Sequence, residues 1–179
     1  DRLLIGGGMC FTFLKALGHS VGDSLCETDQ EQTCRRILDS GAPILLPSDI
    51  TALSPDGDIG GDNGEVRQMG QSMPEGWTGL DIGPGTAAAF EEVIHDARSV
   101  FWNGPMGMFE DPRFAAGTRA VGQALADTKA FTVVGGGDSA AAVSEMGLTP
   151  YMDHISTGGG ASLELLELGD LPGLIALRN

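Results

Sequence analysis

Glycine runs are the clearest chemical signal in the sequence. Residues 6–8, 83–85, 135–137 and 158–160 are rich in glycine, and each run stands between a short apolar segment and a helical pattern. The first N–H groups of a helix have no partner within the helix, and its N-terminus carries about half a positive charge. The last two runs together would therefore form a cradle for an anion, most simply phosphate. The alternative is that glycine only lets a helix lie close to a strand.

Asp138 follows the third glycine run directly. A carboxylate there would repel a bound phosphate unless a cation lay between them, and Mg²⁺ binds one or two carboxylates together with phosphate oxygens. Aspartate is also a good N-cap of a helix. The residue alone leaves both interpretations, a Mg²⁺ ligand and a cap, open.

The segment 102–110, WNGPMGMFE, follows another apolar run. Asn103 and Glu110 have side chains that can hydrogen-bond a sugar, while Pro105 and the methionines offer an apolar wall. The alternative is an irregular loop around Phe109 in the core.

Other motifs fit less well. No P-loop sequence occurs, and the pattern GxGxx[GA] at 83–88 and 135–140 lacks the acidic residue that a dinucleotide site requires about 20 residues further on. Ser139 resembles a nucleophile elbow with Asp153 and His154 downstream. Adjacent residues of a strand point to opposite faces, however, so these two could not complete a triad. The Asp-rich residues 56–64 lack the ligand spacing of a calcium loop.

Alternating strands and helices must position these motifs. Apolar runs occur at 2–5, 43–46, 79–82, 99–102, 130–134 and 154–156. Helical patterns follow them at 9–17, 28–40, 86–97, 113–126, from 138 onwards, and at 161–168. Strands separated by helices indicate a parallel sheet covered on both faces. We therefore expect a doubly wound, Rossmann-like α/β fold with a mostly parallel sheet, and a small surface hairpin at about 49–77. A closed eight-fold barrel would need about 250 residues.

Composition excludes several classes of protein. The chain has 179 residues, of which 25 are acidic and 10 basic, and its net charge is -15. This charge argues against nucleic acid or an anionic membrane as a partner. No apolar stretch approaches the roughly 20 residues of a membrane span, and no signal peptide is visible. The cysteines are odd in number and form no CxxC pair, which favours reduced thiols and a cytoplasmic location.

Several strings closely resemble the phosphoglycerate kinase family. They are GGGM at 6–9 with FTFLK at 11–15, GLDIGP at 79–84, WNGP at 102–105 with GMFE at 107–110, VGGGD at 134–138 and HISTGGGASLELL at 154–166. The match runs in order along nearly the whole chain. It implies the C-terminal, nucleotide-binding domain of an enzyme that transfers a phosphoryl group between 1,3-bisphosphoglycerate and MgADP, giving 3-phosphoglycerate and ATP in glycolysis.

The resemblance also implies a role for each matching residue. The adenine slot would be lined by Gly7, Gly8, Leu25, Gly79 and Leu80. The nucleotide would lie beside Asn103 and Pro105, with its ribose hydroxyls on Glu110. Mg²⁺ would be held by Asp138, and the nucleotide phosphates would be approached by Gly136, Gly137 and Ser139. The transferred phosphoryl group would face the helix N-terminus formed by Ser156, Thr157, Gly158, Gly159 and Gly160.

The resemblance implies missing parts as well. The family has an N-terminal domain with a basic patch for phosphoglycerate, and the first strand and helix of its C-terminal domain carry lysines that reach the phosphates. Residues 1–179 match neither part. We therefore expect a domain incomplete at its N-terminus, nucleotide binding without turnover by this chain alone, and a monomer when the protein is intact. The alternative is a non-catalytic nucleotide- or phosphate-binding module.

Overall fold

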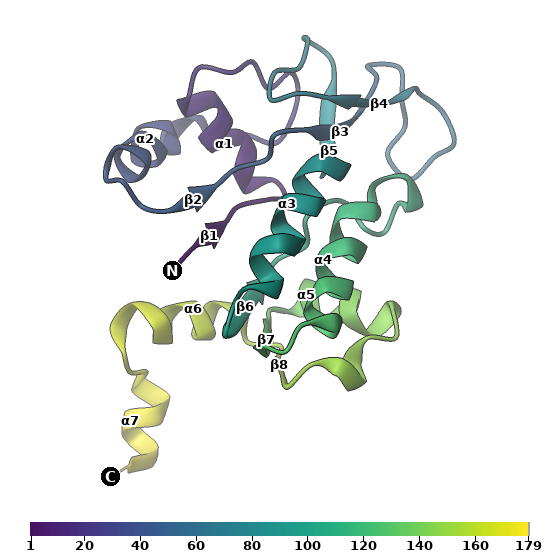
Figure 1. Ribbon diagram of the computed structural model, residues 1–179. Helices are drawn as coiled ribbons and strands as arrows, with labels where there is room; N and C mark the ends of the chain where they lie inside the picture. The colour runs from purple at the N-terminus through teal and green to yellow at the C-terminus, as the bar shows by residue number, and fades with distance from the viewer. Residues whose placement is uncertain (179) are drawn as a thin grey trace.

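The computed structural model describes residues 1–178 (Figure 1). The strands are β1 (Leu3–Leu4), β2 (Ile44–Leu45), β3 (Ile50–Leu53), β4 (Val66–Met69), β5 (Thr78–Ile82), β6 (Ser99–Asn103), β7 (Phe131–Gly135) and β8 (His154–Ser156). The α-helices are α1 (Met9–Ala16), α2 (Glu31–Asp39), α3 (Pro84–His95), α4 (Ala116–Asp127), α5 (Gly137–Glu145), α6 (Gly159–Leu168) and α7 (Pro172–Arg178). Short 3-10 turns precede α2, α4 and β8, at Thr28–Gln30, Pro112–Phe114 and Thr149–Tyr151.

Three small sheets carry the fold. β1 and β2 pair in parallel, and β6, β7 and β8 form a second parallel sheet in that order. β4, β3 and β5 form an antiparallel sheet. Helices separate the parallel strands along the chain, with α1 and α2 between β1 and β2, α4 between β6 and β7, and α5 between β7 and β8. The expected α/β class is confirmed.

The hairpin expected at residues 49–77 is formed by β3 and β4, which pair antiparallel from Ile50 opposite Met69 to Leu53 opposite Val66. Two features differ from the expectation. β3 is buried along its whole length rather than lying on the surface, and its other edge pairs antiparallel with β5. The apolar run at 79–82 therefore belongs to this antiparallel sheet. Such a run indicates burial but carries no strand direction, so periodicity does not distinguish the two pairings.

The helix ends differ from the sequence pattern at two places. The helical pattern expected from residue 28 starts with a 3-10 turn at 28–30 that has no side-chain cap, and α2 begins at Glu31. α4 begins at Ala116, since the residues before it make another 3-10 turn. The pattern ends at residue 40, and the structure agrees: α2 ends at Asp39, and Gly41 has a φ of 76°, a left-handed conformation that favours glycine. The apolar periodicity does not predict α7.

Two buried clusters hold the elements together. One joins α3, α4 and α5 to β6 and β7 around Phe90, Leu125 and Val143. The other joins α1 to β3 around Leu14 and Ile50. These side chains are at most 1% exposed, so the strands that carry the glycine bends are fixed on a rigid base.

The C-terminal helices lie outside both clusters. α6 and α7 extend away from the rest of the molecule (Figure 1), and neither contains a buried residue. Among residues 1–178, no helix is long and apolar enough to span a bilayer.

Candidate functional site

A cavity of about 1770 Å³ is lined by β1 and the bend after it, by β5, and by β6 with the loop beyond it. It brings together the residues expected at the adenine, at the ribose and beside the nucleotide: Gly7, Gly8, Leu25, Gly79, Leu80, Asn103, Pro105 and Glu110. The residues expected near the phosphates, in the bends after β7 and β8, do not line it. A ligand that used all of them would extend from the cavity past Asn103.

The bend after β1 needs glycine because it lies against two other segments. Gly7 has a φ of 58°, and a Cβ atom at this position would lie 2.7 Å from the carbonyl oxygen of Pro105. A Cβ atom on Gly8 would lie 2.7 Å from the Leu25 side chain. The N–H of Gly7 donates to the carbonyl of Met106 at 3.1 Å. Gly7 therefore allows the bend to lie close to the loop that carries Pro105, and Gly8 allows it to lie close to Leu25.

Gly79 has a different reason to be glycine. A Cβ atom there would lie 2.5 Å from the Phe11 ring and 2.9 Å from the Ile50 side chain, both in the core. Packing between β5 and the core thus accounts for this glycine without a ligand. Leu80, next along the strand, is half-buried at the cavity and fixes the loop beyond β6, because its carbonyl accepts the N–H of Met108 at 2.8 Å.

The second glycine run binds a carboxylate of the protein itself. At the start of α3, the Asp49 carboxylate accepts the N–H groups of Gly85 and Thr86 at 2.9 and 2.7 Å. A Cβ atom on Gly83 would lie 2.3 Å from the same carboxyl group. This glycine run is therefore not an open ligand bend, because Asp49 already fills the helix N-terminus.

The Asp81 carboxyl group fills the N-terminus of α4, as Asp49 fills that of α3. The buried Asp81 carboxylate accepts the N–H of Gly117, in the first turn of α4, at 2.7 Å and that of Ile82 at 2.9 Å. Burial raises the pKa of the Asp81 carboxyl to about 7, although both hydrogen bonds lower it. The carboxyl also fills the space beside Gly107 and Gly117, since a Cβ atom on either would lie 2.3 Å from it.

The last two glycine bends are in contact with each other. Gly136, with a φ of 96°, donates its N–H to the carbonyl of Ser156 at 2.8 Å. A Cβ atom on Gly159 would lie 2.8 Å from the Cα atom of Gly136. The first helical bonds run from Ala140 to Gly136 and from Ser162 to Gly158, so the backbone N–H groups before them are free of helical partners. Those groups belong to Gly137, Asp138 and Ser139 in α5 and to Gly159, Gly160 and Ala161 in α6. The two helix N-termini therefore form one anion cradle.

Asn103 connects this cradle to the cavity. It ends β6, lines the cavity, and is placed so that a Cβ atom on Gly136 or Gly159 would lie 2.8 Å from its Oδ1 atom. Ser139 has a fully buried side chain whose hydroxyl accepts the N–H of Gly104 at 2.6 Å. The hydroxyl of Ser139 thus fixes the loop after Asn103 on α5, and only its backbone N–H faces the cradle side of the helix.

Asp138 is not the cap of α5. The N-cap is Gly136, and Asp138 lies in the first turn of the helix with an exposed side chain. Across residues 1–178, no other residue hydrogen-bonds its carboxylate and no group of three His, Cys, Asp or Glu side chains could enclose a metal. A single free carboxylate beside an anion cradle fits Mg²⁺, which takes few protein ligands together with phosphate oxygens and water. The cap interpretation of Asp138 is therefore wrong.

The remaining expected residues precede α6. The Ser156 hydroxyl, half-buried, accepts the N–H of Gly158 at 3.2 Å and shapes the turn. Thr157 and Gly160 are exposed. No triad exists at Ser139, because the Asp153 carboxylate is bonded to the N–H of Thr132 at 2.8 Å and the Ser139 hydroxyl to Gly104.

The sequence did not indicate all cavity residues. Met108, 38% exposed, is one of the methionines expected to form an apolar wall, but Met9 and Ile59, which are 66% and 52% exposed, also line the cavity and were not expected there. Ile59 comes from the loop between β3 and β4, which only the folded chain brings to the cavity. Apolar side chains exposed at a cavity are typical of a site for an apolar group such as a nucleobase.

The fold and the site define an α/β protein whose candidate ligand site lies beyond the carboxyl ends of parallel strands. A protein-family comparison gives the family: the model described as phosphoglycerate kinase matches residues 1–168. This chain belongs to the phosphoglycerate kinase family.

Individual relatives agree with this assignment. The phosphoglycerate kinases of Salinispora arenicola and Corynebacterium urealyticum are each 54% identical to the chain, over 100% and 99% of its length. The structure of phosphoglycerate kinase from Coxiella burnetii superposes with a TM-score of 0.87 at 36% identity, and covers 97% of this chain. The one from Pyrococcus horikoshii superposes with a TM-score of 0.83 at 33% identity, and covers 99% of this chain. The chain spans only about 45% of the length of these relatives.

Proposed function

We propose that this chain is the C-terminal, nucleotide-binding domain of a phosphoglycerate kinase, with ADP and ATP as its ligands. One observation carries the proposal: two contacting helix N-termini with free N–H groups adjoin, through Asn103, a cavity edged by exposed apolar side chains. Free N–H groups suit the phosphates, and the cavity suits the base and ribose.

The proposed nucleotide lies with its base between the bend at Gly7 and Gly8 and the side chains of Leu25 and Leu80. The exposed Glu110 carboxylate accepts hydrogen bonds from the ribose hydroxyls. The phosphates pass Asn103 and Pro105 and reach the cradle, where Asp138 holds Mg²⁺. Mg²⁺ bound there would neutralise part of the negative charge of the phosphates.

In the whole enzyme, we propose an in-line transfer of the phosphoryl group between 1,3-bisphosphoglycerate and ADP, to give 3-phosphoglycerate and ATP. Positioning and charge stabilisation supply most of the acceleration in such reactions. The N–H groups of Gly159 and Gly160, at the N-terminus of α6, donate to the oxygens of the transferred group. Thr157 and Gly158 set the direction in which that helix begins.

We further propose that catalysis needs a part of the protein outside residues 1–179. Among the described strands, β1 pairs only with β2 and β6 only with β7, so each has one unpaired edge, and both strands line the cavity. One more parallel strand would join the two parallel sheets. The bends at 135–140 and 156–161 contain no lysine or arginine to balance the charge of a transition state. We therefore propose that this chain alone binds nucleotide without turnover, and that phosphoglycerate binds to the N-terminal domain of the whole enzyme.

The setting of the protein is part of the same proposal. All three cysteines are free, which supports a cytoplasmic location. A net charge of -15 opposes binding to nucleic acid. We propose a monomer for the intact protein.

Calorimetric titration of the chain with ADP, with and without Mg²⁺, tests the proposal. We expect MgADP to bind more tightly than ADP, and Asp138→Ala to remove that difference. Glu145→Ala is the matched control, because it removes the same charge from the exposed end of α5, outside the cradle. We also expect no ATP from 1,3-bisphosphoglycerate and MgADP.

Three results would contradict the proposal in different ways. No binding of ADP under any condition would remove the nucleotide site. Equal dependence on Mg²⁺ in the wild type and Asp138→Ala would leave the nucleotide site but remove Asp138 as the ligand. ATP formation by the chain alone would show that the segment proposed to be required is dispensable.

A further inference from the structure

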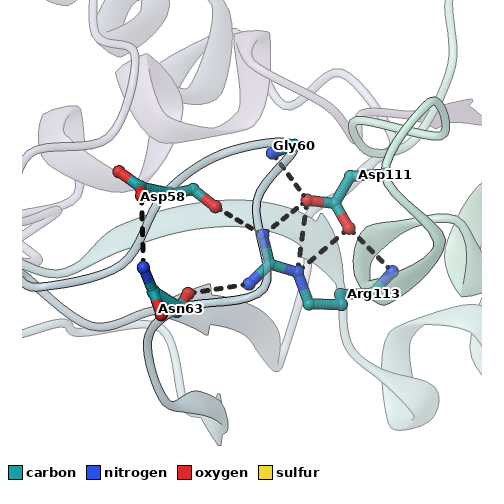
Figure 2. Close-up of polar contacts among 5 residues, drawn as sticks. All are labelled: Asp58, Gly60, Asn63, Asp111 and Arg113. Atoms are coloured by element: carbon teal, nitrogen blue, oxygen red, sulfur yellow. Dashed lines mark hydrogen bonds and ion pairs between the residues drawn. The ribbon is translucent and has the colours of Figure 1, made fainter.

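Arg113 lies at the centre of a polar cluster that joins two distant segments (Figure 2). Its guanidinium donates to both carboxylate oxygens of Asp111, at 3.0 Å from Nε and 2.7 Å from Nη2. Across the same contact it donates to two backbone carbonyls of the loop between β3 and β4, that of Asp58 from Nη2 at 2.5 Å and that of Asn63 from Nη1 at 2.9 Å. The segment before α4 is thus fastened to the β3–β4 loop.

Asp111 completes the contact from its own side. Its carboxylate accepts the N–H of Gly60 at 3.0 Å, and the Arg113 guanidinium holds its pKa well below its usual range. The Asp111 side chain is 5% exposed and that of Arg113 22%. A partly buried, bidentate pair of this kind is geometrically stricter than an exposed ion pair. The pair fixes the loop at Asp58, Gly60 and Asn63.

Ile59 stands between two of these anchored residues and lines the cavity. Its side chain is 52% exposed although its neighbours on both sides are held through their backbone atoms. On the other side of the pair, Glu110 precedes Asp111 directly and also lines the cavity. The pair therefore connects an apolar group and a carboxylate of the cavity that are far apart in the sequence.

We infer that Arg113 is a positioning residue for the nucleotide: together with Asp111 it holds the β3–β4 loop so that Ile59 forms one apolar wall of the nucleotide cavity, which Glu110 also lines. This inference rests on the proposed function, since it names what shapes the same site. Arg113 itself touches no ligand. It acts through Ile59, which loses its fixed place when the backbone bonds to Asp58 and Asn63 are absent.

Arg113→Met tests the inference, because methionine keeps the apolar stem and removes the donors. We expect Arg113→Met and Ile59→Ala each to weaken MgADP binding about tenfold, the effect of one large apolar contact. The double variant should bind no more weakly than the weaker single variant, because both changes remove the same wall. Titrations are run well below the thermal midpoint of each variant, so that all are folded.

Arg67→Met is a matched control. Arg67 also pairs with a carboxylate two residues before it, Glu65, and also lies over an aromatic ring, that of Trp77 at 4.8 Å. It is an exposed side chain of β4 and does not line the cavity. We expect this variant to bind MgADP as the wild type does.

Hydrogen exchange at the Gly60 amide provides a second readout. We expect its protection to fall in Arg113→Met and to stay in Arg67→Met. The inference would be overturned if Arg113→Met bound MgADP with wild-type affinity. It would also be overturned if the effects of Arg113→Met and Ile59→Ala multiplied in the double variant. Either result would leave the nucleotide site intact. Failure of the wild type to bind MgADP would overturn the proposed function and this inference with it.

Discussion

Gly159→Ala tests the contact between the two glycine bends. The added methyl carbon would lie 2.8 Å from the Cα atom and 3.1 Å from the nitrogen of Gly136, and 2.8 Å from the Asn103 Oδ1 atom. Carbon atoms in contact are normally about 3.5–4.0 Å apart, so the methyl group overlaps its neighbours by roughly 1 Å. Two of the three neighbours are backbone atoms of a bend tied to Ser156, and they have no rotamer to change.

The expected magnitude follows from that overlap. Inserting a carbon into a packed site costs about 1–3 kcal/mol of the free energy of unfolding, while alanine in place of glycine inside a helix gains up to about 1 kcal/mol. We expect Gly159→Ala to lose about 1–2 kcal/mol net and to weaken MgADP at least tenfold, because the bends that hold the phosphates are pushed apart.

Urea unfolding and calorimetric titration measure the two effects. Gly173→Ala, in α7, is the control: nothing lies within 4 Å of the added carbon, and the position is outside the site. That variant should bind as the wild type and be equally or slightly more stable. If Gly159→Ala had the same stability and the same affinity for MgADP as Gly173→Ala, the two bends would not be in contact and would not form one cradle.

Two further predictions concern the carboxylates that cap helices. Asp49→Ala should lower the free energy of unfolding by about 1–2 kcal/mol, as for loss of an N-cap, measured by urea unfolding; no change would mean that α3 does not need this carboxylate. For Asp81, burial raises the pKa to about 7 from the 3.8 of an aspartate in water, so the folded protein keeps a proton that the unfolded chain releases. The stability that Asp81 contributes is complete below about pH 4 and is lost as the pH rises to about 7. Thermal midpoints across this range should fall more in the wild type than in Asp81→Asn, and parallel curves would contradict the assignment.

The parts of the fold that the sequence predicts are those set by neighbouring residues. Helices between apolar runs, the glycine bends after β7 and β8, and the stop at Gly41 all follow from local patterns. The direction of β5 is set instead by pairing with β3, in which Ile50 lies opposite Ile82. The two strands are about 30 residues apart in the sequence, so no local pattern shows that they pair. The expectation that the run at 79–82 belongs to the parallel sheet is therefore wrong.

The same division holds for the site. Residues next to a glycine run or in the segment after β6 could be identified from the sequence, and the cavity gathers those expected at the base and ribose. Ile59 could not, because it reaches the cavity through bonds from Arg113 to a loop 50 residues or more away. Sequence spacing also does not show that the Ser139 hydroxyl already accepts a hydrogen bond from the N–H of Gly104.

The glycine runs show why a motif alone overestimates the number of ligand sites. The start of α3 is a glycine bend with an N-terminus that attracts anions, as at α5 and α6, yet Asp49 from a distant segment already occupies it. Asp81 occupies the start of α4 in the same way. At α5 and α6 no carboxylate of another segment caps the free N–H groups in the part of the chain that the structure describes. The free N–H groups of a helix N-terminus attract an acceptor in all four cases by the same physics, and whether the protein itself supplies that acceptor depends on one residue elsewhere in the fold.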